Sequence, residues 1–508
     1  MKTLPHLAAI FLLCQALAFG GSFFAKSGAS PEVVSPTPKS PEPPRPSILR
    51  VNSTNQAYDF FQPWQKKSPF SRRGIGVVIP DGRILVTAEL IANSNFIELE
   101  KAATAEKSTA VIERVDYDCN LAILRPADSA FLEGMPPIEF DGKTTIGDSA
   151  TVLQLEPNGE IAETTGRISS IAIAPYPLDN LGLLVFKLSA PLQQRDGSFT
   201  LPAVRDGQLL GLIMRYDARN QIADIIPMPV IQRFLQQAAA PTYRGFPRLG
   251  ISYSPLRDPQ LRRYIGLKEP GGIYITKVTA DGSAAKAGLL PGDVLLAIND
   301  HPLDQDGNYE DPQHGRILFS HLSNTATAAG EKSTLKIFRD GTIQNLTATM
   351  EPPDRSRIAS PAFLADTAPP FVILGGLVFI ELSRPFLQEW GADWAKSAPQ
   401  RLVYLDAFQD ELPEDRGKIV VLARVLPTPD TIGYDNLGNL VVKELNGQPV
   451  KSLTDLVKAS QTPLDGFQKI ELEEDPKWLF LDAKSIESNR ARLMEHYDLP
   501  TLERPTAN

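Results

Sequence analysis

Residues 271–303 read GGIYITKVTADGSAAKAGLLPGDVLLAINDHPL, and this stretch decides the fold of the middle of the chain. It begins with an apolar strand and a turn, continues with a helix of small residues at 283–287, and reaches a second strand after Gly292 and Asp293. Further strands are expected around 334–339, together with a helical stretch at 316–322. We therefore expect an α+β unit over residues 244–352.

Upstream, residues 48–241 carry short apolar runs separated by turn residues, the pattern of a β-barrel or a β-sandwich. Val230, Ile231 and Phe234 recur at helical spacing and predict a helix at 229–240 that ends this unit. The expected strands lie at 74–80, 83–87, 96–99, 110–115, 121–124, 150–155, 166–173, 183–188 and 209–214.

Downstream, residues 370–484 repeat the ingredients of the middle unit, and a helix around 485–497 is expected within the last segment, 485–508.

At 508 residues, with 42% apolar and 22% charged residues, the chain has enough apolar material for two to four domain cores. A net charge of −9 without a basic run argues against a nucleic-acid partner and leaves proteins or peptides as ligands.

The N-terminus has the form of an export signal. Lys2 precedes an apolar run at 7–17 that closes in small residues, so residues 1–20 are expected to be cleaved. An uncleaved anchor or a buried helix is the alternative. The proline-dense segment 21–47 is expected to be an extended linker. We therefore expect a soluble periplasmic or extracellular protein.

Two segments of the first unit carry a family resemblance. GIGVVIPDGRILVTAELIA at 74–92 and VDYDCNLAILRP at 115–126 resemble the HtrA/Deg family of trypsin-type serine proteases with PDZ domains. In that family the first hairpin ends in Asn-Ala-His, whereas this chain has Thr-Ala-Glu ending at Glu89. Asn120 stands at the position of the family's aspartate. The nucleophile position falls near Ser198, on Gly197 or Phe199 by two alternative alignments.

These departures decide the expected chemistry. A serine becomes a nucleophile only when a base removes its proton, and none of the five histidines lies between residues 48 and 241. Glu89 would need a strongly raised pKa to be that base, and it would then carry charge beside a developing oxyanion. The alternative is that these residues have no catalytic role: Glu89 and Asn120 are then surface or vestigial polar residues, and Ser198 is an ordinary loop serine.

The middle unit resembles a PDZ domain of the same family. The resemblance implies that Arg248, Leu249, Gly250 and Ile251 receive a peptide C-terminus through backbone N–H groups and β-augmentation. The other wall of that groove is expected to include Ile317, Leu318 and His321, which could equally be core residues, with His321 more naturally an exposed histidine. Neither a metal nor a cofactor is expected.

The resemblance narrows to a plant-Deg-like branch through residues 244–267, the insert at 304–315 and residues 375–387. It implies a mainly β chain, with a trypsin-like double β-barrel at 48–241 followed by two α+β PDZ-type domains. The second of these is divergent, and we favour a structural role for it. The resemblance also implies a homo-oligomer, typically a trimer.

The functional expectation is an exported pseudoprotease that binds peptides or protein C-termini and acts as a scaffold, chaperone-like or regulatory protein in envelope quality control. Two alternatives stay open. One is an active endopeptidase with a rearranged site near Ser198, and the other is an inactive subunit that regulates an active protease paralogue.

Overall fold

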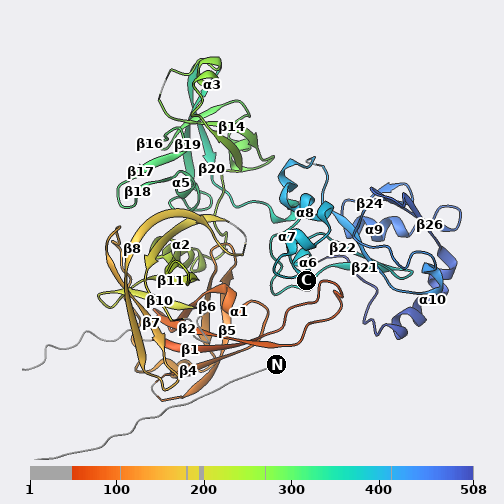
Figure 1. Cartoon of the computed structure of the whole chain (residues 1–508), viewed down its shortest axis with the longest axis horizontal. Helices are drawn as coiled ribbons and strands as arrows, with labels where there is room; N and C mark the ends of the chain where they lie inside the picture. The colour runs from red at the N-terminus through yellow and green to blue at the C-terminus, as the bar shows by residue number, and fades with distance from the viewer. Residues whose placement is uncertain are drawn as a thin grey trace, which may run out of the picture. The chain divides into compact units, whose positions relative to one another are not determined.

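The computed structural model describes residues 48–102, 104–178, 181–193, 200–268, 270–413 and 415–506 (Figure 1). The predicted signal and linker, and the nucleophile position at Ser198, lie outside the described residues. Within the described part of the chain, no helix is both long and apolar enough to cross a membrane.

The first six strands close into a barrel, drawn in red to orange in Figure 1. Its interior is filled by fully buried aliphatic side chains, among them Leu49, Val51, Leu99 and Leu124. The strands run around the barrel in the order β1 (Ile48–Asn55), β2 (Phe70–Ile79), β3 (Arg83–Val86), β6 (Leu121–Pro126), β5 (Lys107–Asp116) and β4 (Ser94–Lys101).

The hairpin between β2 and β3 turns at Asp81 and Gly82, whose φ angles are 67° and 64°. Positive φ at both central residues is the type I′ turn, which matches the twist of a two-stranded hairpin and is favoured by an Asp-Gly pair. The short helix α1 (Ala88–Ile91) follows β3. This tight connection places Glu89 directly at the end of the hairpin.

The next six strands close into a second barrel, which confirms the expected double barrel. The helix α2 (Met228–Ala238) follows it and buries Val230, Ile231 and Phe234, as their helical spacing predicted. The strand order is β10 (Leu201–Arg205), β11 (Gln208–Asp217), β12 (Ile222–Pro227), β9 (Gly182–Ser189), β8 (Ile161–Pro175) and β7 (Ser149–Leu155).

The middle unit is an open sheet with short helices. Its strands are β13 (Ile251–Pro255), β14 (Ile273–Val278), β15 (Val294–Ile298), β19 (Lys332–Arg339) and β20 (Thr342–Thr349), in that order, with β16 (His301–Pro302) paired to β15. Its helices are α3 (Pro259–Tyr264), α4 (Ser283–Lys286) and α5 (Ser320–Asn324).

The helix predicted at 316–322 is wrong in its first half. Residues Gly315–Leu318 form strand β18, which pairs with β17 (Asn308–Asp311) in a separate hairpin, and only α5 beyond it is helical. The pairing with β17 overrides the helical spacing of the apolar residues, because the strand partner comes from the preceding insert.

The third unit is a sheet with the order β27 (Trp478–Asp482), β26 (Phe467–Leu472), β24 (Leu440–Leu445), β23 (Val420–Val425), β22 (Leu377–Glu381), β21 (Phe371–Leu374) and β28 (Glu503–Arg504), with β25 (Gln448–Pro449) paired to β24. Its helices are α6 (Arg384–Gln388), α7 (Trp394–Ser397), α8 (Gln400–Ala407), α9 (Leu453–Ser460) and α10 (Ala483–His496). The segment 485–508, expected as a helix and tail, supplies most of α10 and also β28, which pairs with β21.

Candidate functional site

The structure brings two of the three expected catalytic positions together at the end of the first hairpin. The backbone N–H of Glu89 donates to Asn120 Oδ1 at 2.9 Å, and the N–H of Ala88 donates to the Asn120 carbonyl at 3.1 Å. Asn120 is completely buried and has a φ of 54°, a conformation that asparagine tolerates better than most residues. It is therefore a structural link between α1 and the start of β6, and not a surface residue.

A threonine pair beside Glu89 was not anticipated from the sequence. The hydroxyls of Thr87 and Thr200 lie 2.6 Å apart, and the N–H of Thr87 donates to Thr200 Oγ1 at 3.2 Å. Thr200 is fully buried, and its carbonyl accepts a hydrogen bond from Ile75 at 3.0 Å. Thr200 is the first described residue after position 193, and this pair fixes its place beside α1.

The charge environment of Glu89 differs from that of an imidazole base. Burial raises the pKa of Glu89, while Arg72 and Arg215 act in the opposite direction. An Arg72 guanidinium N–H also donates to the Glu89 carbonyl, and burial lowers the pKa of Arg72. The site thus holds a half-buried carboxylate beside two arginines, in place of an imidazole.

A second group of buried polar residues precedes Asn120. The Asp116 carboxyl accepts hydrogen bonds from the N–H of Asp118 at 2.8 Å and from the Tyr243 hydroxyl, and Arg355 forms an ion pair with Asp118. Burial and the neighbouring Asp118 raise the pKa of Asp116 to about 6. Ionised Asp116 is therefore less favourable in the folded chain than in the unfolded chain.

The raised pKa of Asp116 predicts that the free energy of unfolding of the chain depends on pH. Between the unfolded pKa of 3.8 and the folded value of about 6, the folded state binds the extra proton, so stability falls as pH rises through this window. The free energy of unfolding of Asp116→Asn, relative to that of wild type, is therefore expected to rise by on the order of 3 kcal/mol between pH 4 and pH 7. Urea unfolding of both proteins at the two pH values measures this.

An exposed residue that carries no titratable group supplies the control for that experiment. Gln344 of β20 is exposed, and Gln344→Ala is expected to show the same difference from wild type at both pH values. A difference for Asp116→Asn that does not change with pH would contradict the assignment.

The expected peptide-binding loop of the middle unit is held by backbone hydrogen bonds. The Arg248 N–H, expected to receive a peptide carboxylate, instead donates to the Glu351 carbonyl at 3.0 Å. The Leu249 carbonyl accepts from Ala284 at 3.0 Å, and the Gly250 carbonyl accepts from Thr279 at 2.9 Å. Gly250 has a φ of 76°, which glycine adopts without strain. Ile251 then begins β13, the terminal strand of its sheet, which pairs only with β14 among the described strands. The other edge of β13 is therefore a place for an added strand.

The residues expected on the opposite wall are distributed differently from the prediction. Ile317 is 2% exposed and belongs to the core, while Leu318 is half-buried. His321 is only 6% exposed, so the expectation of an exposed histidine is wrong. The ring of Phe319 packs edge-on against Tyr253 of β13, with centroids 5.3 Å apart, and brings the start of α5 beside the terminal strand.

The corresponding loop of the third unit, at Gly375 and Gly376, is enclosed by the chain itself. Strand β22, which follows the loop, lies between β21 and β23, so both of its edges are paired. A Cβ placed on Gly375 would lie 2.9 Å from Ile486 of α10, and the cavity beside the loop measures only about 100 Å³. In this unit, β22 takes the place of β13, and the edge that β13 leaves unpaired is paired with β21.

Metal-type ligands meet at one place in the described part of the chain. Asp311, His314 and His321 each offer a ligand atom, and these atoms lie within 4.8 Å of one another. No pattern in the sequence predicts this group, because the three residues come from a hairpin and a helix that were not expected in this arrangement.

Comparison with known proteins adds family information. Models described as "PDZ domain" match residues 247–350 and 361–503. The chain is 26% identical to protease Do-like 2, chloroplastic, of Arabidopsis thaliana, over 90% of this chain and 74% of the relative. It is 25% identical to the putative mitochondrial protease Do-like 3 of the same plant, over 90% and 79%. A solved structure of the HtrA-type protease AlgW with a tripeptide aligns at 23% identity over 61% of this chain and 95% of that one, with a TM-score of 0.46.

Proposed function

Because the chain is an HtrA/Deg-family protein with two PDZ domains, we propose that it is a non-proteolytic member that binds peptides through the first of them. The ligands are extended segments or the C-termini of other proteins. The observation that carries this proposal is the open edge of β13, directly after the loop of Arg248, Leu249 and Gly250. A peptide added there gains main-chain hydrogen bonds, and its carboxylate meets the loop.

The composition of the barrel supports the absence of cleavage. No histidine occurs in residues 48–241, and the described positions that correspond to base and orienting acid hold Glu89 and Asn120, joined through a backbone N–H. Asn120 orients the backbone of α1, whereas a triad requires the acid to orient a histidine side chain.

The third unit supports a structural role for the second PDZ domain. Its corresponding strand, β22, is already paired on both edges, and α10 packs over the glycine loop. Peptide capture is therefore assigned to the first PDZ domain alone.

In the cell, the proposed role is that of a scaffold, chaperone-like or regulatory protein. Lys2 and the apolar run at 7–17 support export to the periplasm or outside the cell. A homo-oligomer is part of the proposal, as is the alternative in which the chain regulates an active protease paralogue. Copurification from envelope extracts separates these, because a regulatory subunit brings the active protease with it.

The peptide site is tested by changing Gly250, because its positive φ shapes the loop. In the full-length chain, Gly250→Ala is expected to weaken the binding of a C-terminal peptide with an apolar last residue by about tenfold or more. Binding is followed by fluorescence titration against a peptide library. The same peptides with amidated C-termini are expected to bind at least tenfold more weakly than those with free carboxylates.

Gly266 provides a matched control. It has a φ of 75°, ends α3, and has open space around the position of a Cβ. Gly250→Ala and Gly266→Ala should each cost about 1–2 kcal/mol of folding stability, but Gly266→Ala should bind peptides as wild type does. Equal binding by both variants, or no peptide bound more tightly than millimolar, would refute the proposed site.

A further inference from the structure

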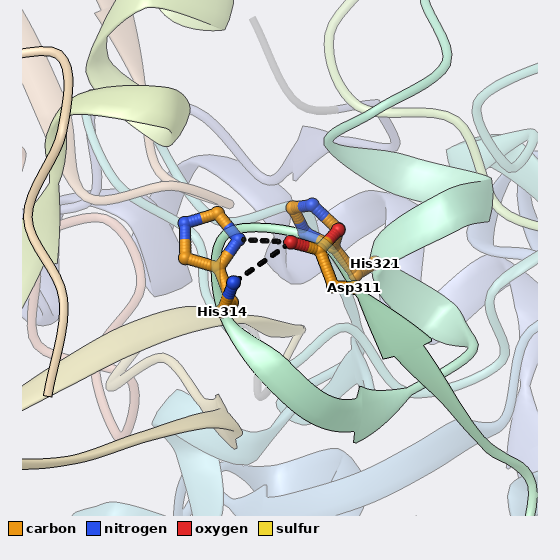
Figure 2. A group of neighbouring side chains, drawn as sticks. All are labelled: Asp311, His314 and His321. Atoms are coloured by element: carbon orange, nitrogen blue, oxygen red, sulfur yellow. Dashed lines mark hydrogen bonds and ion pairs between the residues drawn. The ribbon is translucent and has the colours of Figure 1, made fainter.

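The strongest unassigned feature of the described residues is the cluster of Asp311, His314 and His321 (Figure 2). Asp311 ends β17, His314 lies in the turn before β18, and His321 lies in α5. The three side chains therefore come from two elements joined by a short loop. Figure 2 shows the Asp311 carboxylate joined to His314 by two dashed lines, with the His321 ring next to the carboxylate in this view.

The carboxylate is held in place by hydrogen bonds. Asp311 Oδ1 accepts from the N–H groups of Gln313 and His314, each at 2.9 Å, and Oδ2 accepts from the Tyr309 hydroxyl at 2.9 Å. His314 Nδ1 lies 2.9 Å from Oδ1. This separation is close to the distance of about 3 Å between adjacent ligands of a metal with metal–ligand bonds of about 2 Å. The oriented carboxylate and its hydroxyl partner are typical of the outer contacts that fix metal ligands.

Both imidazoles are buried, and their hydrogen bonding is incomplete. His314 is 7% exposed and His321 is 6% exposed. Among the described residues, His321 Nδ1 and His314 Nε2 have no hydrogen-bond partner. A buried ring nitrogen without a partner destabilises a fold unless another species binds it, and His321 Nδ1 is the atom of this kind that an ion in the cluster would satisfy.

Aromatic rings lie close to the cluster and to one another. The Phe186 ring of the second barrel lies 5.8 Å from the His314 ring, and the two histidine rings lie 5.7 Å apart at 73° to each other. Two imidazole nitrogens and one carboxylate oxygen suit Zn²⁺, whereas Ca²⁺ and Mg²⁺ prefer oxygen ligands throughout.

We propose that Asp311, His314 and His321 form a binding site for a divalent transition-metal ion, with Zn²⁺ the best match to the three ligands. When the ion binds His314 Nδ1, the proton on that nitrogen moves to Nε2, so the ring changes tautomer and stays neutral. The ion ties the turn of the β17–β18 hairpin to α5. Neither peptide binding nor peptide cleavage is required for the ion to bind.

The test is a calorimetric titration of ZnCl₂ into full-length protein that was produced without a histidine tag and freed of metal by a chelator. Wild type is expected to bind one equivalent of Zn²⁺ and to show a higher Tm in its presence. His314→Gln and His321→Gln are each expected to weaken binding at least 100-fold and to abolish the Tm shift. His496→Gln, which changes an exposed histidine of α10, should bind one equivalent as wild type does.

Asp311→Asn keeps the shape of the side chain and its role as acceptor for the two backbone N–H groups, so it provides a variant that folds even if the histidine variants do not. It is expected to bind Zn²⁺ at least tenfold more weakly while its Tm in chelator stays near that of wild type. A wild-type chain that binds no equivalent of Zn²⁺ would overturn the proposal. So would folded Asp311→Asn and His321→Gln variants with unchanged affinity.

Discussion

Purified full-length protein is expected to leave casein intact over many hours and to take no label from a fluorophosphonate probe. The reason is that serine catalysis needs a base, and the barrel contains no histidine. Removing the base from an intact triad lowers kcat by about a million-fold. Glu89 does not replace it, because a carboxylate is a weak base unless its pKa is strongly raised, and Arg72 and Arg215 oppose the rise that burial gives the pKa of Glu89.

The Ser198→Ala variant is the control for this result, and an active trypsin-type protease under the same conditions confirms that the assay works. Wild type and Ser198→Ala should be indistinguishable in casein cleavage and in labelling. Cleavage and labelling that disappear in Ser198→Ala would instead favour the alternative of an active endopeptidase with a rearranged site.

The second large effect is expected at Arg339 of the first PDZ domain. Its guanidinium binds Asp293 in a bidentate pair, with both N···O distances 2.6 Å, and Asp293 is 2% exposed. Arg339→Ala leaves this buried carboxylate without its cation, and breaking such a pair costs about 3–5 kcal/mol. That is a large part of the stability of a domain. Hydrogen exchange of the β15 and β19 amides, followed by mass spectrometry in the whole chain, measures the loss locally.

The matched control is Arg401, which pairs with Glu473 and Glu474 at the surface and is about half exposed. Its replacement by alanine should cost no more than about 1 kcal/mol, because water screens exposed pairs and solvates the charges that remain. If Arg339→Ala were as mild as Arg401→Ala, Asp293 would not depend on its cation for burial.

The strands of both barrels could be predicted from the sequence because turn residues mark their ends. All nine expected strands of this region fall on observed strands, with ends that differ by a few residues. Short apolar runs flanked by pairs such as Asp81 and Gly82 leave little choice of local structure. Strands β1, β10 and β12 were missed, and each is defined by pairing with distant strands as much as by its own pattern.

The candidate sites were predictable only where one short segment carries them. The loop of Arg248–Gly250 and the following strand are contiguous, so the sequence located them. The other wall of the expected peptide groove could not be located from the sequence. Strand β18 takes its partner from the preceding insert, and the burial of His321 depends on packing around α5. The metal-type cluster was missed for the same reason, since no spacing rule joins Asp311 and His314 to a residue in a later helix.

The open edge of β13 also sets what kind of molecule can reach it. An added strand must present its own backbone N–H and C=O groups in extended form over the five residues of β13. A helix has those groups already paired, so it offers nothing to this edge, whereas an extended C-terminal tail or an unfolded segment presents them. The proposed site therefore selects the backbone conformation of its ligand as well as its side chains.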